Sequence, residues 1–177
     1  ERITRELFEL LVDEEKLVSR AAFTALIDLV EFFDAPYRRE HFYPIIKSYI
    51  TSPPEEVLSL LVDEFGRFLW KIKTDIQGAE DVTLFANFYR QSAQKSDPEV
   101  RRLCAFNLPA VVASLPLSVF PTHLTQVQRA LAVDSHPPTR RAIAAGMHEL
   151  CTLLGDRAAF FLKDSFIALI QDTSIEV

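Results

Sequence analysis

The stretch "SDPEVRRLCAFNLPAVVASL", residues 96–115, decides the fold. Its polar start, with Asp97 and Pro98, is typical of a first helical turn, where an aspartate caps free N–H groups and proline has no N–H to lose. Apolar residues then recur at spacings of three and four, as on a helix with one buried face. Pro109 interrupts this pattern, and because its ring removes a backbone hydrogen bond, we expect the helix to bend or break there.

The same polar corner followed by a helix recurs along the chain. When the first apolar residue of each such helix is aligned, the separations are 39, 43, 39 and 38 residues. The aligned residues are Val18, Val57, Val100, Thr139 and Val177. A period near forty built from two helices is typical of HEAT-type or armadillo-type arrays. We therefore expect an all-α fold, a right-handed α-α superhelix of about four and a half helix pairs.

The pattern predicts a single array over residues 1–177. The expected repeats span 2–33, 38–72, 80–115, 117–154 and 158–177, the last one truncated. The expected helices are 2–12, 14–33, 38–51, 54–72, 80–94, 98–115, 117–132, 137–154 and 158–171. Because the chain opens on Glu1 and closes on what reads as a helix start, we expect it to be a fragment of a longer protein.

Composition excludes several classes of protein. The chain of 177 residues is 49% hydrophobic and 25% charged, which is globular composition. A net charge of −6 argues against nucleic acid as a partner, and no apolar run is long enough to cross a membrane. Cys104 and Cys151 form no disulfide framework; we expect both to be buried, in a protein of the cytoplasm and also of the nucleus.

No catalytic motif is present in the sequence. The histidines are His41, His123, His136 and His148, and none belongs to an HExxH pair or to a recognisable nucleophile motif. The two cysteines have no CxxC partner, which leaves a zinc site without support. We therefore expect a protein that is not an enzyme, with no catalytic residue, no metal and no cofactor.

Paired arginines occupy equivalent positions in consecutive repeats. They are Arg101–Arg102 and Arg140–Arg141, and Arg20 matches the second member of the pair in the first repeat. One arginine of each pair is expected to form an internal ladder with an aspartate at the preceding corner: Asp97, Asp134 or Asp172. Because adjacent helix residues point about 100° apart, the other arginine is free to face a partner.

The amino-acid sequence of the third and fourth repeats resembles that of a known family. "DPEVRRLCAFNLPAVV" and "PPTRRAIAAGMHELCTLLGD" resemble HEAT repeats of the scaffold and regulatory subunits of the protein phosphatase 2A group, and more narrowly the regulatory subunits of protein phosphatase 4. The resemblance is specific over residues 96–177 and general before them. It implies a non-catalytic solenoid that holds a phosphatase catalytic subunit or its substrates, with other subunits docking on the within-repeat corners.

Two explanations stay open for the corner residues, because capping of the helix N-termini alone would account for the acids. The candidate protein-binding residues are Asp13, Glu14, Arg20, Glu55, Glu56, Asp97, Glu99, Arg101, Arg102, Asp134, His136, Arg140 and Arg141. Trp70 is either a packing residue or an interface anchor.

Three functions remain in competition, and all three need protein partners. The first is a scaffold or regulatory segment within a serine/threonine phosphatase complex. The second is a transport or vesicle-trafficking adaptor, karyopherin-like or Rab-linked, that binds peptide motifs. The third is a tubulin-binding array, which the acidic corners disfavour because tubulin binding would prefer basic ones.

Overall fold

The computed structural model describes residues 2–76 and 78–177, without the side chains of residues 2–4 and 56. These residues form helices joined by turns, and no β-strand occurs among them. The α-helices are α1 (Arg2–Leu10), α2 (Lys16–Leu29), α3 (Ala35–Tyr37), α4 (Tyr43–Thr51), α5 (Glu55–Asp63), α6 (Phe65–Ile72), α7 (Gly78–Ser92), α8 (Pro98–Ser114), α9 (Thr125–Ala132), α10 (Pro137–Leu154) and α11 (Ala158–Ile170). Short 3₁₀ turns lie at Val30–Phe32 and Gly155–Arg157, and π turns at Arg38–Phe42 and Phe120–Leu124.

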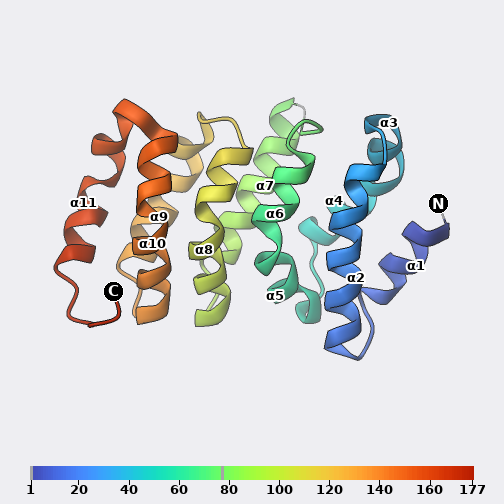
Figure 1. Cartoon of the computed structure of the whole chain (residues 1–177), viewed down its shortest axis with the longest axis horizontal. Helices are drawn as coiled ribbons and strands as arrows, with labels where there is room; N and C mark the ends of the chain where they lie inside the picture. Colours follow the sequence, from blue (N-terminus) through green and yellow to red (C-terminus); the bar gives the residue numbers. More distant parts are fainter. Residues whose placement is uncertain (1, 77) are drawn as a thin grey trace.

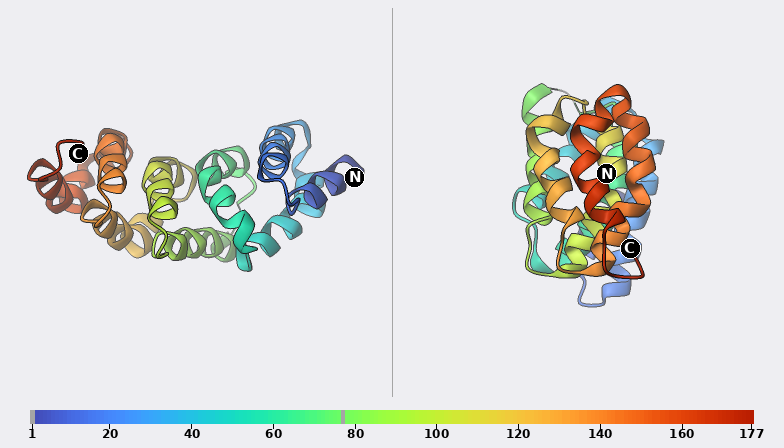
Figure 2. Two further views of the ribbon diagram at one scale, coloured as in Figure 1. Left: turned by 90° about the horizontal axis from the view of Figure 1, so that it is seen from below. Right: turned by 90° about the vertical axis from the view of Figure 1, so that its left-hand side faces the viewer.

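The helices stand side by side in one row, with α1 at one end and α11 at the other (Figure 1). The row is curved: α2, α6, α8 and α10 line its concave side, and α4, α7 and α9 line its convex side (Figure 2). The main contacts run between neighbours, since α8 packs against α6 and α10, and α10 packs against α9 and α11. The expected all-α solenoid of stacked helix pairs is thereby confirmed.

One expected helix, 54–72, is divided in two. The break between α5 and α6 lies at Glu64, whose backbone leaves the helical region with φ −92° and ψ 2°. The side chain of Asn107, from α8, fills the break. Its Nδ2 donates to the carbonyl oxygens of Val62 and Asp63 at 2.9 and 3.0 Å, and its Oδ1 accepts from the N–H of Gly66 at 3.1 Å. The amide thus bonds backbone groups on both sides of the break.

Other departures from the expected helices occur beside prolines. The expected helix 38–51 is a π turn followed by α4, which has Pro44 in its first turn; the short α3 lies before it. The expected helix 117–132 begins as the π turn that contains Pro121 and continues as α9. A proline has no N–H, so one regular backbone hydrogen bond is missing near each π turn.

Pro109 does not break α8: of the bend or break that we expected there, the break is excluded. The helix runs without interruption from Pro98 to Ser114 with Pro109 inside it. The proline ring is buried against α10: a Cβ added at Gly146 would lie 2.9 Å from Pro109 Cγ. The ring therefore occupies the space that the missing side chain of Gly146 leaves, and this contact brings α8 and α10 close together.

The core follows the interior of the row and is rich in aromatic rings. Tyr89 is 1% exposed, and its hydroxyl donates to the carbonyl oxygen of Cys104 at 2.7 Å. Burial raises the pKa of both the Tyr89 hydroxyl and the Cys104 thiol. Cys104 is buried as expected, but the expectation is wrong for Cys151, which is exposed. It follows the buried Leu150 on α10 and so points about 100° away from it.

Replacement of Asn107 tests the importance of the α5–α6 break. Asn107→Ala removes the hydrogen bonds that the Val62 and Asp63 carbonyls and the Gly66 N–H make with this side chain. We expect a loss of about 2–4 kcal/mol in the free energy of unfolding, measured by urea denaturation. Asn87, on α7, is the matched control: among the described residues its side chain bonds only the exposed Arg90, so Asn87→Ala is expected to cost about 0.5 kcal/mol or less. Equal effects of the two replacements would contradict this account.

Candidate protein-interaction surfaces

Two arginines at the corners join consecutive repeats through the same set of contacts, and Arg38 makes the corresponding contacts with Asp75 and with the carbonyl oxygen of Phe33. Nε and Nη2 of Arg101 donate to the carboxylate of Asp134 at 2.6 and 3.0 Å. Nε and Nη2 of Arg140 donate to Asp172 at 2.5 and 2.9 Å. The Nη1 groups donate to backbone carbonyls of the arginine's own corner, those of Lys95 and Ser96 for the first and that of Asp134 for the second. The ladder that the sequence predicts therefore exists, with two bidentate rungs.

The direction of the ladder differs from our expectation. Each arginine is the fourth residue of its helix and reaches forward to the corner of the following repeat, not back to the preceding one. Asp97 is not a ladder partner; its carboxylate caps α8 by accepting the N–H of Glu99 at 2.8 Å. Asp134, a ladder aspartate, lies two residues further from the start of its own helix, α10, than Asp97 does from the start of α8. It accepts the N–H of His136. A capping aspartate and a ladder aspartate look alike in the sequence, and their distance from the helix start separates them.

The rungs are largely shielded from water, and the hydrogen bonds that they contain lower the pKa of their carboxyl groups. The side chains of the four residues are between 8% and 16% exposed. Burial raises the pKa of Asp134, but the hydrogen bonds from Arg101 and from the His136 N–H together have the larger, opposite effect. The pKa of Asp134 is therefore lowered overall. Hydrogen bonds from Arg140 and from the Ser174 N–H lower the pKa of Asp172 to about 2. Both carboxylates are therefore charged at neutral pH.

The second arginines do not form one common row. Arg20 pairs with Asp63 of the next repeat at 3.0 Å. Arg102 instead pairs with Glu99 of its own helix, and hydrogen bonding to Arg102 lowers the pKa of that glutamate. Arg141 is exposed, and within residues 2–76 and 78–177 its side chain has no hydrogen bond or ion pair. Among these residues, only Arg141 meets the expectation of a free arginine directed at solvent.

The corners lie along one edge of the row, the lower edge in Figure 1. Asp13 accepts the N–H of Glu15 at 2.9 Å, and the neighbouring Glu14 is exposed. Glu55 begins α5 and is exposed, whereas the side chain of Glu56 lies outside the described residues. His136 precedes α10, and its Nδ1 lies 3.2 Å from the Thr139 hydroxyl. The corner residues that the sequence predicts are thus spread along one edge rather than gathered into one site.

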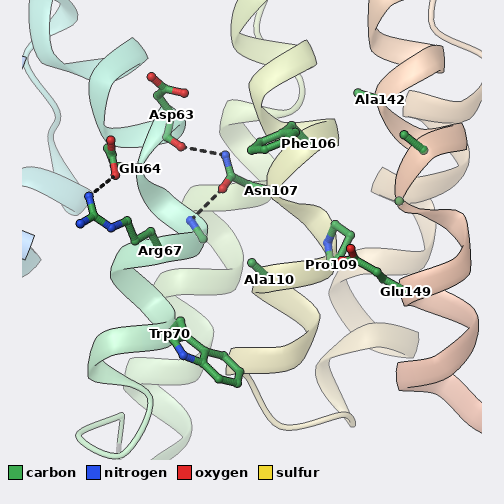
Figure 3. Close-up of a pocket in the computed structure, with 13 residues that line it drawn as sticks. Asp63, Glu64, Arg67, Trp70, Phe106, Asn107, Pro109, Ala110, Ala142 and Glu149 are labelled. Carbon is green, nitrogen blue, oxygen red and sulfur yellow. Dashed lines mark hydrogen bonds and ion pairs between the residues drawn. The ribbon is translucent and has the colours of Figure 1, made fainter. Parts of the chain in front are cut away.

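A further surface, which we call the concave hollow, lies across α6, α8 and α10 (Figure 3). Its volume is about 620 Å³ and its floor consists of small residues and a proline: Gly66, Pro109, Ala110, Ala142, Ala145 and Gly146. Trp70 and Phe106 border it and are 51% and 67% exposed. The charged residues around it are Asp63, Glu64, Arg67 and Glu149.

The sequence holds a weak signal for the concave hollow. Small residues recur on the helices that contain Gly66, Ala110 and Gly146. Whether these residues face one another depends on how the helices pack, and the forty-residue period of the sequence does not reveal this packing. Phe106 falls within the apolar pattern of α8, and our interpretation of that pattern did not single it out as exposed. For Trp70, both roles were left open; half of its surface is in fact exposed, and Lys73 Nζ lies 3.2 Å from its ring centre.

Other kinds of site were sought within the part of the chain that the structure describes. There, no group of three or more His, Cys, Asp or Glu side chains is arranged to hold a metal ion. No helix in that part has both the length and the apolar character needed to span a membrane.

Stacked helix pairs tied by arginine–aspartate rungs define the chain as an α-solenoid of the HEAT type. No family model matches it. The chain is 28% identical over 200 residues to the serine/threonine-protein phosphatase 4 regulatory subunit 4 of human, and equally to that of mouse. These alignments cover 97% of this chain and 22% of each relative, so the chain spans about a fifth of their length. The similarity extends well beyond residues 96–177, the part in which the sequence resemblance was specific. It supports a relationship to a family of HEAT-repeat regulatory subunits.

The neighbouring arginines Arg140 and Arg141 provide a matched test of the ladder. Arg140→Gln removes the bidentate contact and leaves Asp172 without its cation, so we expect the free energy of unfolding to fall. Arg141→Gln changes an exposed residue and is expected to cost about 0.5 kcal/mol or less. Urea denaturation of both variants measures the difference. If Arg141→Gln destabilised the fold as much as Arg140→Gln, the assignment of rungs would be wrong.

The ladder also predicts how stability depends on pH. The pKa of each rung aspartate is lower in the folded chain than the value of about 3.9 in an unfolded one, so the stabilisation is complete above that value and is lost as the pH falls toward about 2. We expect the double variant Asp134→Asn/Asp172→Asn to melt at a lower temperature than the unaltered chain at neutral pH. Its melting temperature should also fall less between about pH 5 and about pH 2.5.

Thermal melts followed by circular dichroism across this pH range measure both effects. Asp156→Asn is the control, because Asp156 is exposed and belongs to no rung. A fall in melting temperature that is equally steep in the double variant and in the unaltered chain would contradict the prediction.

Proposed function

We propose that this chain is a non-catalytic scaffold segment that binds other proteins within a serine/threonine protein phosphatase complex. The observation that carries the proposal is the similarity over 97% of the chain to a protein named as a phosphatase 4 regulatory subunit. A solenoid suits this role because each repeat packs only on its neighbours, which leaves an extended surface open to partners. The chain acts in the cytoplasm and also in the nucleus.

The corner edge is the surface that we assign to the other subunits of the complex. Shielded rungs hold the corners of the last three repeats at fixed positions relative to one another. Surfaces that are already rigid lose little conformational entropy on binding, which favours affinity. Glu14, Glu55 and Arg141 extend into solvent along or beside this edge, and charged groups in such positions steer association and set specificity.

Association with a phosphatase tests the proposal. We expect the full-length protein, purified through a tag, to bring down a phosphatase catalytic subunit. The triple variant Glu14→Lys/Glu55→Lys/Arg141→Glu should weaken this association by about tenfold or more while the melting temperature stays within about a degree, since the replaced side chains are exposed. Quantitative pull-down and a thermal melt measure the two effects.

Charge reversal elsewhere is the control for this experiment. Glu80 and Asp156 are exposed residues at the opposite ends of their helices, away from the corners, and Glu80→Lys/Asp156→Lys should leave the association unchanged. Recovery of cargo receptors, Rab-type GTPases or tubulin in place of a phosphatase would overturn the proposal in favour of a trafficking or cytoskeletal role.

A further inference from the structure

We propose that the concave hollow binds a short extended segment of a partner protein that carries one bulky apolar side chain and, a few residues away, a lysine or arginine. The inference rests on the protein-binding role but not on the identity of the phosphatase. It concerns a face of the molecule that the corner edge does not include, and three features of the hollow support it.

The shape of the hollow follows from the close approach of its helices. A Cβ added at Gly66 would lie 2.5 Å from Asn107 Oδ1 and 2.7 Å from the Ala110 Cβ, and one added at Gly146 would lie 2.9 Å from the Pro109 ring. The floor therefore contains no large side chain that could rise into the space above it. A volume of about 620 Å³ remains open to solvent and is large enough for side chains of another chain.

Two large aromatic side chains border this space without being needed for the core. Trp70 extends from α6 and Phe106 from α8, on either side of the Ala110 and Pro109 floor (Figure 3). Phe106 is 67% exposed although its neighbours Ala105 and Asn107 are buried. Exposed aromatic residues beside an apolar concavity are typical of interaction sites, where they contribute a large contact area on burial. An apolar side chain of a partner fits between them.

The charges of the hollow select a basic partner rather than an acidic one. Arg67 is already bound by Asp28 and by Glu64, so its charge is compensated. Asp63 is bound by Arg20. Glu149, on α10, keeps a carboxylate that is 58% exposed; within the described residues its only ion-pair neighbour is His148, 3.8 Å away and charged only when protonated. A lysine or arginine of a partner would supply the cation that Glu149 lacks.

The extent of the hollow sets the form of the bound segment. The hollow runs from α6 across α8 to α10 (Figure 3). Neighbouring helix axes are about 8–10 Å apart, so this path is about 20 Å long. About six residues of an extended chain, at about 3.3 Å each, cover that distance. The apolar side chain then lies near Trp70 and Phe106, and the basic one lies at the α10 end near Glu149.

Selection of peptides against the 177-residue chain tests this inference. The probe is a displayed random library of peptides of about twelve residues, twice the length that crosses the hollow. We expect the enriched peptides to share an aromatic or long aliphatic residue and a lysine or arginine at a fixed spacing. Trp70→Ala and Phe106→Ser should each weaken a selected peptide by about tenfold, measured by fluorescence anisotropy. Glu149→Lys should replace the selected basic residue by an acidic one.

Matched controls separate the hollow from the rest of the surface. Phe32→Ser removes an aromatic side chain that is 81% exposed outside the hollow, and Asp156→Lys reverses an exposed charge elsewhere; both should leave peptide binding unchanged. The inference is overturned by a library that yields no enriched peptide, by acidic consensus peptides, or by binding that survives Phe106→Ser. A concentration-dependent dimer that Phe106→Ser abolishes would assign the hollow to a second copy of the chain and would also overturn it. None of these outcomes depends on whether a phosphatase is recovered with the full-length protein.

Discussion

The contact that the rest of the array depends on is the one between α8 and its two neighbours, made by Asn107 and Pro109. On one side, the Asn107 amide bonds the backbone at the break between α5 and α6. On the other side, the Pro109 ring takes the space beside Gly146 of α10. Because a solenoid is stabilised by interfaces between neighbouring repeats, a helix that fixes both of its interfaces with buried, shape-matched contacts sets the spacing of three repeats at once.

This close spacing explains why the two faces of the array differ in character. On the concave side, glycine and alanine allow the helices to approach, and the same small residues leave a hollow between Trp70 and Phe106. Along the corner edge, the spacing brings Asp134 and Asp172 within reach of arginines from the preceding repeat. The packing that stabilises the array therefore also creates both candidate surfaces for partners.

The paired arginines illustrate how helix geometry divides two adjacent residues between two roles. Arg140 and Arg141 differ by about 100° in direction around α10. The first is turned toward the next repeat and is 15% exposed, whereas the second faces solvent. In the repeat before it, Arg101 forms the rung, but Arg102 folds back onto Glu99 of its own helix. The equivalence of the second arginines in the sequence therefore does not extend to their contacts.

Periodicity was enough to predict the solenoid and most of its helices, because apolar spacing and proline positions are local properties of the chain. The expected helices 98–115 and 137–154 match α8 and α10 to within a residue. The break at Glu64 could not be predicted in this way, since its cause is a side chain on another helix, 43 residues further along the chain. The same reason applies to Pro109, whose effect depends on the glycine opposite it. For the candidate sites, the sequence indicated the ladder residues, but the partner of each arginine depended on the stacking of repeats.

The ladder covers only the last three repeats, and this has a consequence for how a partner would act. At the positions equivalent to Arg101, the first two repeats have Ser19 and Leu58, so the rungs cannot form there. On the concave side, the first two repeats are joined by Arg20–Asp63 and Arg67–Asp28, whose side chains are between 26% and 59% exposed and therefore contribute little. Arg38, in contrast, binds both carboxylate oxygens of Asp75, and these two side chains are 15% and 1% exposed. Shielded arginine–aspartate pairs therefore occur in both the N-terminal and the C-terminal parts of the array, although only the last three repeats have them at the corners. The concave hollow spans three repeats, because α6 belongs to the second repeat and α10 to the fourth. A segment bound across it would contact three consecutive repeats at once and so stabilise their arrangement.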